Sequence, residues 1–144
     1  MDAQRHDLGA LFVRLGQAMI DAELPVLARF DLPMWDYVVL VALRDGPVQS
    51  QSRLSAVTGR DQTRLIPILD RLAERGALRR VPDPTDRRAR IVELTAEGLS
   101  LATGCQSAIR QMERELLSDL PEPDRQSFVG LLERVAGLVL GRQD

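Results

Sequence analysis

The chain has 144 residues, of which 44% are hydrophobic and 28% are charged, with a formal net charge of −2. These values are typical of one globular domain with a sizeable core. One cysteine excludes a disulfide framework, and one histidine with one cysteine cannot form a Cys/His metal cluster. With no glycine-rich phosphate loop and only scattered carboxylates, we predict no metal, no cofactor, no catalytic residues and no enzyme activity.

The N-terminal part of the chain predicts two helices. Residues 6–23 form the first, because six apolar positions recur at helical spacing: Leu8, Leu11, Phe12, Leu15, Met19 and Ala22. Pro25 is expected to interrupt this helix, and Val26–Phe30 to continue it after a kink. Asp31-Leu32-Pro33 is a break. The second helix, Met34–Leu43, is apolar nearly all round, which predicts burial at the centre.

The stretch Gly46–Gly98 predicts a helix–turn–helix followed by a hairpin. Its elements are a helix at Ser50–Val57, a turn at 58–60, a helix at Asp61–Arg75 stopped by Gly76, and strands at Leu78–Val81 and Arg90–Leu94. Val48 could pair briefly with the hairpin. This order is typical of a winged helix, a module that reads DNA.

The second helix of this pair has two distinct faces. Leu65, Ile68, Leu69 and Leu72 fall on one side at about 100° per residue, and Thr63, Arg64, Pro67, Arg71 and Glu74 fall opposite. The apolar side would hold the helix on the core, so the arginine-bearing side faces outward. A solvated surface helix has the same pattern, but the hairpin that follows favours DNA binding.

The charge is unevenly distributed along the chain. Residues 60–90 hold nine arginines and five acids, a local charge of +4, whereas the remainder holds ten arginines and sixteen acids, a charge of −6. A local basic surface is what phosphate contacts need, so the acidic total does not exclude DNA binding.

Candidate DNA contacts come from the outward face of this helix and from the preceding helix start. Arg64 and Gln62 suit base contacts, Thr63 suits a phosphate or a thymine methyl, and Pro67 lies on the same face. Arg71 is assigned to phosphate. Ser50 and Gln51 can also reach phosphate.

Two more helices complete the chain. Thr95 is predicted to cap a long helix, and Ser118–Pro123 is the turn into a last helix, Asp124–Leu140. The first and last helices carry more apolar surface than one small winged helix can bury, which favours a role as dimer arms. No apolar run approaches ~20 residues and the first seven residues are polar, so we expect a cytoplasmic protein without a membrane span.

Three stretches resemble the MarR (multiple antibiotic resistance regulator) family: Leu54–Gly59, 70–76 (DRLAERG), and 83–88 (DPTDRR) followed by 92–98 (VELTAEG). With the flanking helices, the resemblance covers nearly the whole chain. It implies a mostly α fold with a small β-hairpin wing, in a single domain over 1–144. A winged helix DNA-binding lobe would occupy about 32–95, and helical dimerisation regions about 5–30 and 96–141.

The same resemblance assigns roles in the wing and at Pro67. Arg88 would enter the minor groove and Asp86 would orient it by a charge-assisted hydrogen bond, while Arg87 and Arg90 could add phosphate contacts. Propensity alone starts the recognition helix near Ile66, but the organic-hydroperoxide-sensing branch of the family continues this helix past its proline. A homodimer on an imperfect palindromic operator of double-stranded DNA is implied, with repression expected and activation open.

The resemblance also places a pocket for a small aromatic or lipophilic effector among the helices. The candidate lining residues are Leu15, Met19, Trp35, Val38, Val39 and Ile109, for which plain core packing is an alternative. An alternative to effector binding is thiol-based redox sensing by Cys105. The peroxide-sensing branch of the family, however, carries its reactive cysteine in the first helix. A third alternative is a winged helix that binds a protein partner and not DNA.

Overall fold

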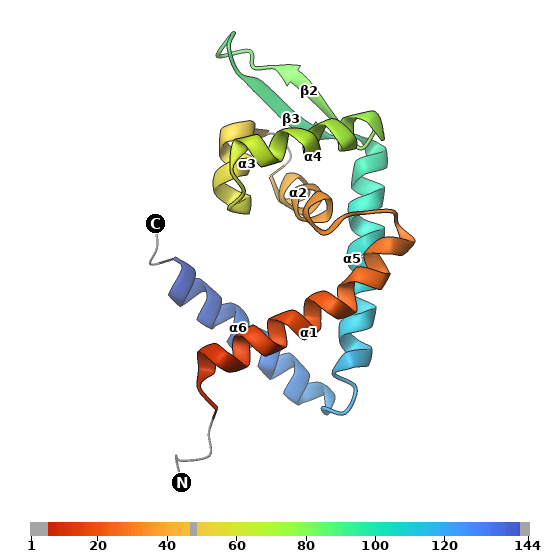
Figure 1. Ribbon diagram of the computed structural model, residues 1–144, viewed down its shortest axis with the longest axis vertical. Helices are drawn as coiled ribbons and strands as arrows, with labels where there is room; N and C mark the ends of the chain where they lie inside the picture. Colours follow the sequence, from red (N-terminus) through yellow and green to blue (C-terminus); the bar gives the residue numbers. More distant parts are fainter. Residues whose placement is uncertain (1–5, 47–48, 142–144) are drawn as a thin grey trace. The chain divides into compact units, whose positions relative to one another are not determined.

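The computed structural model describes residues 6–46 and 49–141, and it confirms the predicted mostly α fold with a small hairpin (Figure 1). The chain divides into two compact units, Met1–Ile109 and Arg110–Asp144, with the boundary inside α5. In chain order the elements are α1 (Leu8–Arg29), α2 (Met34–Asp45), β1 (Gln49–Ser50), α3 (Gln51–Thr58), α4 (Gln62–Glu74), β2 (Leu78–Pro82), β3 (Arg90–Leu94), α5 (Ala96–Leu116) and α6 (Glu122–Leu140).

The first helix corrects the expected interruption at Pro25. α1 runs from Leu8 to Arg29 with this proline inside it, so the expected interruption was wrong, whereas the expected continuation after Pro25 is present as far as Arg29. An interior proline costs about 3 kcal/mol. The next two residues, Val26 and Leu27, are buried. Burying one aliphatic side chain completely contributes roughly 1.5–3 kcal/mol, so the burial of both offsets the cost of the proline.

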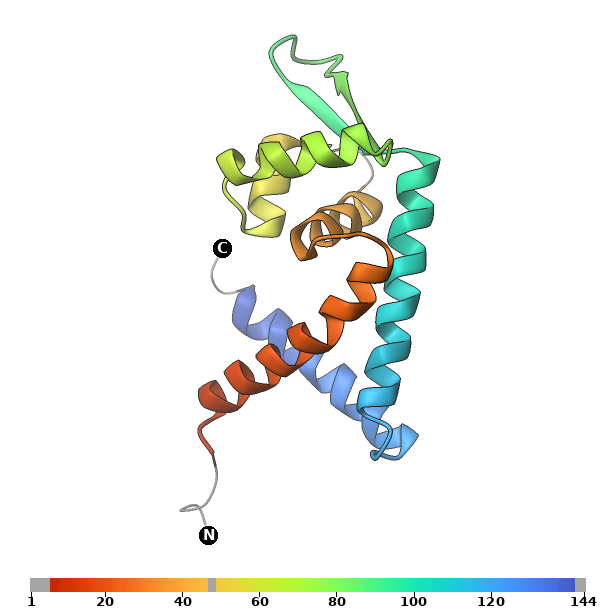
Figure 2. The same ribbon diagram turned by 45° about the vertical axis from the view of Figure 1, so that its right-hand side comes forward.

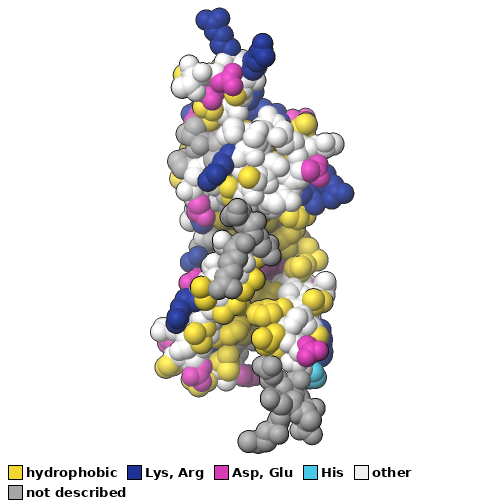
Figure 3. All heavy atoms as spheres, turned by 90° about the vertical axis from the view of Figure 1, so that its left-hand side faces the viewer, with side chains coloured by type: hydrophobic (Ala, Val, Ile, Leu, Met, Phe, Trp, Pro, Cys, Tyr) yellow, Lys and Arg dark blue, Asp and Glu magenta, His cyan; other side chains and the backbone are white. Residues whose placement is uncertain are grey.

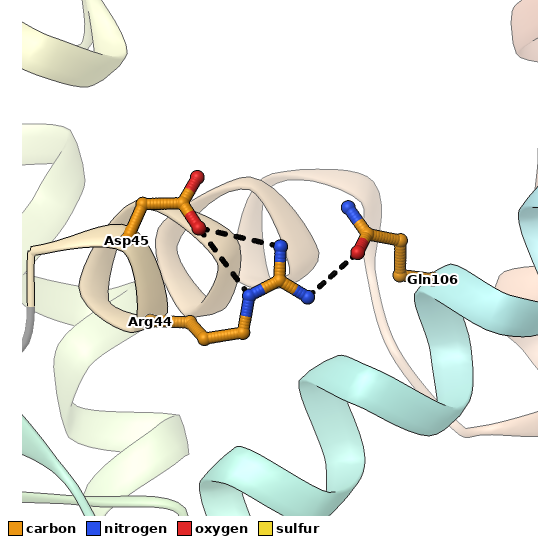
Figure 4. Close-up of polar contacts among 3 residues, drawn as sticks. All are labelled: Arg44, Asp45 and Gln106. Carbon is orange, nitrogen blue, oxygen red and sulfur yellow. Dashed lines mark hydrogen bonds and ion pairs between the residues drawn. The ribbon is translucent and has the colours of Figure 1, made fainter.

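The second helix lies at the centre of the first unit, as predicted. Val39, Leu40 and Leu43 of α2 are fully buried, and the helix extends two residues beyond its predicted end, to Asp45. At its C-terminal end Arg44 Nη1 donates a 2.7 Å hydrogen bond to Gln106 Oε1 of α5, and its Nε and Nη2 contact Asp45 Oδ1 (Figure 4). This contact joins α2 to the part of α5 within the first unit.

The helix–turn–helix has capping groups at its helix ends. Ser50 Oγ accepts from the backbone N–H of Arg53, and Asp61 Oδ1 accepts from that of Arg64, so each side chain satisfies an otherwise unpaired donor. Gly59 (φ +69°) and Gly76 (φ +77°) end α3 and the turn after α4 in the left-handed region that favours glycine.

The recognition helix candidate, α4, continues through Pro67 from Gln62 to Glu74. The start near Ile66 that propensity alone indicates was therefore wrong, and the helix implied by the family resemblance is the one observed. Asp61 caps the helix several residues before the proline, which keeps the first turn in place.

A three-stranded antiparallel sheet of order β1-β3-β2 carries the hairpin. Leu78 pairs with Leu94 and Pro82 with Arg90, which sets the strand register. The short β1 pairs with the other edge of β3, whereas Val48, predicted to do so, lies outside the described residues. In both ribbon views the hairpin projects beyond α3 and α4, and α2 lies on the opposite side of these helices (Figures 1 and 2).

The long helix α5 begins as predicted after Thr95, whose Oγ1 accepts from the backbone N–H of Gly98 and donates to the carbonyl of Gly76. In the second unit, α6 begins at Glu122, two residues before its predicted start. The described part of α6 buries none of its residues, although many are large and apolar. Across the described ranges, no helix is long and apolar enough to cross a membrane.

Candidate nucleic-acid interface

The two faces of α4 are separated as the sequence predicts. Leu65, Ile68, Leu69 and Leu72 are buried against the core of the first unit. The opposite face is exposed and holds all five of its candidate contacts: Gln62, Thr63, Arg64, Pro67 and Arg71. Because the apolar side of α4 is buried, the polar side chains on its opposite face are the ones that solvent or a DNA duplex can reach.

Arg64 combines exposure with local restraint. Its side chain is 67% exposed, and its Nε lies 3.4 Å from Asp61 Oδ2. The same carboxylate caps α4 through the backbone of Arg64. An exposed pair of this kind is weak, so it can be exchanged for a base or a phosphate at small cost.

A hollow of about 210 Å³ brings residues from three segments together. It lies between the start of α3, the start of α4 and the β2–β3 hairpin, and Gln62 Nε2 donates a 3.3 Å hydrogen bond to Ser52 Oγ there. Its lining residues are Ser50, Gln51, Ser52, Gln62, Arg88, Ala89 and Arg90. Five of these seven are predicted DNA contacts that are up to 40 positions apart in the chain.

The loop of the hairpin is shaped by aspartate side chains. Asp83 Oδ1 accepts from the backbone N–H and the hydroxyl of Thr85, and these hydrogen bonds lower the pKa of Asp83. Asp86 Oδ1 accepts from the backbone N–H of Arg88 at 3.0 Å. The structure thus gives Asp86 a backbone partner on Arg88, whereas the sequence reasoning assigned it the guanidinium.

The wing arginines themselves are exposed. The side chains of Arg87, Arg88 and Arg90 are all exposed, and Figure 3 shows arginine side chains projecting from the surface at the hairpin end of the molecule. Nearer the core the sheet arginines are paired, Arg79 with Glu93 and Arg80 with Asp70. Within the hairpin, the arginines without an ion-pair partner among the described residues are therefore the ones in and beside the loop.

A second hollow, of about 430 Å³, lies between the start of α2 and the outward face of α4. The guanidinium carbon of Arg60 stands 4.2 Å from the centre of the Trp35 ring, a cation–π geometry. The lining residues are Pro33, Met34, Trp35, Arg60, Thr63, Arg64, Pro67, Ile68 and Arg71. This hollow gathers the remaining predicted contacts of α4.

Two residues of this site were missed by the sequence reasoning, Asp36 and Arg60. Asp36 is 3% exposed and accepts hydrogen bonds from Arg71 at 2.7 Å (Nη2) and 3.3 Å (Nε), which raise the pKa of Arg71. A signal existed for Asp36, because it is the only charged residue in the apolar stretch Met34–Leu43. For Arg60, placed in a turn, no sequence pattern indicated a partner on α2.

The residues proposed for an effector pocket do not gather around one hollow among those described. Val39 and Ile109 are buried in the core, Met19 and Val38 are half-buried, and Leu15 is exposed. Of these six residues, only Trp35 lines either of the two hollows described above, the one beside the outward face of α4. Burial is consistent with the core-packing alternative for Val39 and Ile109.

The thiol of Cys105 is fully buried. Burial, with the nearby charge of Glu23 as a smaller cause, raises the pKa of this thiol to about 11. A thiol that is neutral and enclosed at physiological pH is a poor nucleophile.

Residues 32–89 match the model of the MarR family. The HTH-type transcriptional repressor NicR of Pseudomonas putida is 35% identical over 99 residues, which cover 69% of this chain and 63% of that protein. The match therefore spans less than two thirds of the length of this curated relative.

Solved structures are similar over almost the whole chain. Apo MarR from E.coli is 26% identical, with a TM-score of 0.84 over 92% of this chain and 98% of that chain. A mutant of the same protein in complex with operator DNA gives a TM-score of 0.74 at 26% identity, over 89% of this chain and 92% of that chain.

Proposed function

Because the chain belongs to the MarR family, we propose that it is a transcriptional regulator that binds operator DNA as a homodimer. The observation that carries this proposal is the single surface formed by the start of α3, the outward face of α4 and the wing. An exposed helix suits the major groove, where base edges are distinguishable, and exposed arginines beside it suit phosphate or a narrow minor groove.

Each part of this surface has a distinct role in the proposal. Arg64 and Gln62 read base edges, because both are exposed at the start of α4 and carry side chains able to make paired hydrogen bonds. Ser50, Gln51 and Arg90 hold phosphates around the smaller hollow, and Arg88 reaches the adjacent minor groove with Arg87 near it. The similarity to MarR bound to operator DNA supports this arrangement.

The homodimer supplies two such surfaces. Large apolar side chains are exposed along α1 and along α6, and burying them against a second copy would remove them from water (Figure 3). Two recognition helices related by a two-fold axis fit half-sites about one helical turn apart, ~34 Å, so the operator is an imperfect palindrome.

Repression is the regulatory sense that we propose, because the relative NicR is a repressor by name. Such a repressor acts in the cytoplasm by occupying a promoter. Release by a small aromatic or lipophilic effector would require that the effector bind one spacing of the two recognition helices better than the other, since equal affinity shifts nothing.

The proposal is tested by binding to random and to selected DNA. Genomic fragments retained by the purified protein are sequenced, and affinity for a recovered site is compared with affinity for a random duplex over a range of salt concentrations. We expect a palindromic site and a steep fall in affinity with salt. Absence of retention of any duplex at low salt would instead favour a protein-binding winged helix.

Replacing Arg64 with alanine distinguishes a contact to a DNA base from a contact to phosphate that any DNA sequence would offer. We expect the preference for the site over random DNA to fall by about 1–3 kcal/mol, the range of one paired base contact. An equal loss on both DNAs would assign Arg64 to a phosphate. Arg53, an exposed arginine on α3 outside both hollows, provides the matched control as Arg53→Ala.

A further inference from the structure

The only buried charged side chain of the described residues belongs to Asp36, in the first turn of α2. Both of its oxygens contact one edge of the Arg71 guanidinium, Oδ1 to Nη2 and Oδ2 to Nε. Arg71 stands on the outward face of α4, and its side chain is 51% exposed. The pair therefore links the core helix directly to the surface that we assign to DNA.

This geometry limits what Arg71 can do on DNA. The Nε–Nη2 edge is occupied by the carboxylate, so only the edge that contains Nη1 remains for another acceptor. The paired groups also carry no net charge, so Arg71 adds little to the long-range attraction of a polyanion. An unpaired arginine at the same place would attract every duplex, whatever its sequence.

We propose that Asp36 is a specificity-determining residue of the DNA-binding surface. It acts through Arg71: it cancels the charge of that arginine and fixes the direction of its free edge, so that Arg71 contributes a placed hydrogen bond and little general attraction. This inference rests on the proposed function, since it concerns how the same surface discriminates between an operator and other DNA.

The substitution Asp36→Asn retains the size and one hydrogen-bond acceptor of the side chain while removing its charge. Each protomer then gains one uncompensated cation at the interface. We expect affinity for a random duplex to rise several-fold and the salt dependence of log K to steepen by about 2 for the dimer. The ratio of operator to random affinity should fall roughly tenfold.

Two further variants make the test specific. The double variant Asp36→Asn with Arg71→Gln replaces the ion pair by a neutral pair of similar size, so its salt dependence should equal that of the wild type. Asp70→Asn is the charge control, because Asp70 of α4 likewise forms an ion pair with an arginine, but that arginine, Arg80, lines neither hollow. It should leave the ratio unchanged. Folding of each variant is followed by circular dichroism.

The outcomes separate this inference from the function on which it rests. A wild type that binds no duplex would remove both. With a wild type that binds, the inference is overturned if Asp36→Asn lowers both affinities by one factor, as a merely structural residue would, or if Asp70→Asn reduces the ratio equally. If Asp36→Asn does not fold, the double variant alone tests the inference. A salt dependence of log K that is shallower than that of the wild type by about 2 would show that Arg71 is an ordinary phosphate contact, and would overturn the inference.

Discussion

The α-carbon of Gly98 lies directly against the backbone carbonyl of Ala77. A β-carbon built at position 98 would stand 1.8 Å from that oxygen, far inside any permitted contact. The same carbonyl accepts a hydrogen bond from the backbone N–H of Thr95 at 3.1 Å. The first turn of α5 is therefore joined to the residue that precedes β2, which fixes the base of the wing.

The first prediction concerns this contact. Gly98→Ala should lower the free energy of unfolding by about 3 kcal/mol, at the upper end of overpacking effects, because a backbone carbonyl cannot rotate away as a side chain can. Gly104→Ala is the control in the same helix: its β-carbon would meet only the Phe30 ring, at an ordinary 3.6 Å. That variant should be neutral or up to about 1 kcal/mol more stable. Urea unfolding of both variants measures the difference.

A second prediction concerns Cys105. The native thiol should react slowly with an aromatic disulfide reagent at neutral pH and rapidly after unfolding in urea, because it is buried and its pKa is raised. Peroxide should leave operator binding unchanged. Rapid native modification, together with a peroxide response that Cys105→Ser abolishes, would establish the redox-sensing alternative instead.

The same thiol predicts a pH dependence of stability. Its pKa is about 11 in the folded protein, above the ordinary value of 9.0, so the folded state retains the proton more tightly than the unfolded state. This contribution is complete at neutral pH and is lost as the pH rises from about 9 to about 11. Between pH 8 and 10.5 the wild type should lose more stability than Cys105→Ala, and a parallel loss in both proteins would contradict the prediction.

A third prediction concerns the wing. Arg88→Ala should weaken operator binding and reduce the salt dependence by about 1 per protomer, with an unchanged melting temperature. The reason is that this exposed side chain makes no hydrogen bond or ion pair with the described residues, and the hydrogen bond to Asp86 comes from the backbone N–H of Arg88. Arg79→Ala is a control in the same sheet, where the arginine is paired with Glu93. Equal effects of the two substitutions would indicate general charge and not a wing contact.

Local patterns were enough to predict most of the elements and the outward face of α4. Strand Arg90–Leu94 and the cap at Thr95 depend on neighbours within a few residues, and both are present. Pro25 shows the limit of such reasoning. Its local penalty argues for a break, but the burial of Val26 and Leu27 depends on the rest of the unit and outweighs it.

Contacts distant in the chain could not be predicted in this way. The Asp36–Arg71 pair and the Arg60–Trp35 stack join α2 to residues 25 or more positions away, and no periodicity encodes them. The polar character of Asp36 within an apolar helix could have indicated a buried partner, but not which arginine would provide it. The residues of the effector pocket were assigned from the family resemblance, because helical spacing alone does not distinguish a pocket wall from core.

A fourth prediction concerns the dimer. Leu131, Val135 and Leu138 lie on one side of α6 at helical spacing and are exposed. Introducing arginine at both leucines should convert the protein to a folded monomer and abolish operator binding, because two charges would have to be buried in the interface. Gln126→Arg places the same charge on the other side of α6 and should leave the dimer intact. Sedimentation velocity reports the outcome; a dimer that survives the double substitution would exclude this side of α6 as the interface.

The last prediction concerns the two prolines inside helices. Pro67 deprives the Thr63 carbonyl of its helical partner, as Pro25 does for Asp21, so replacing either by alanine should raise the free energy of unfolding by roughly 1–3 kcal/mol. Both prolines are exposed, but Pro67 lies among the candidate contacts of α4, whereas Pro25 lies on α1 and lines neither hollow. Only Pro67→Ala should therefore also reduce the preference for operator over random DNA, since it changes both the apolar surface and the path of the recognition helix. Equal DNA-binding behaviour of the two variants would show that Pro67 has no role beyond its local effect on the helix.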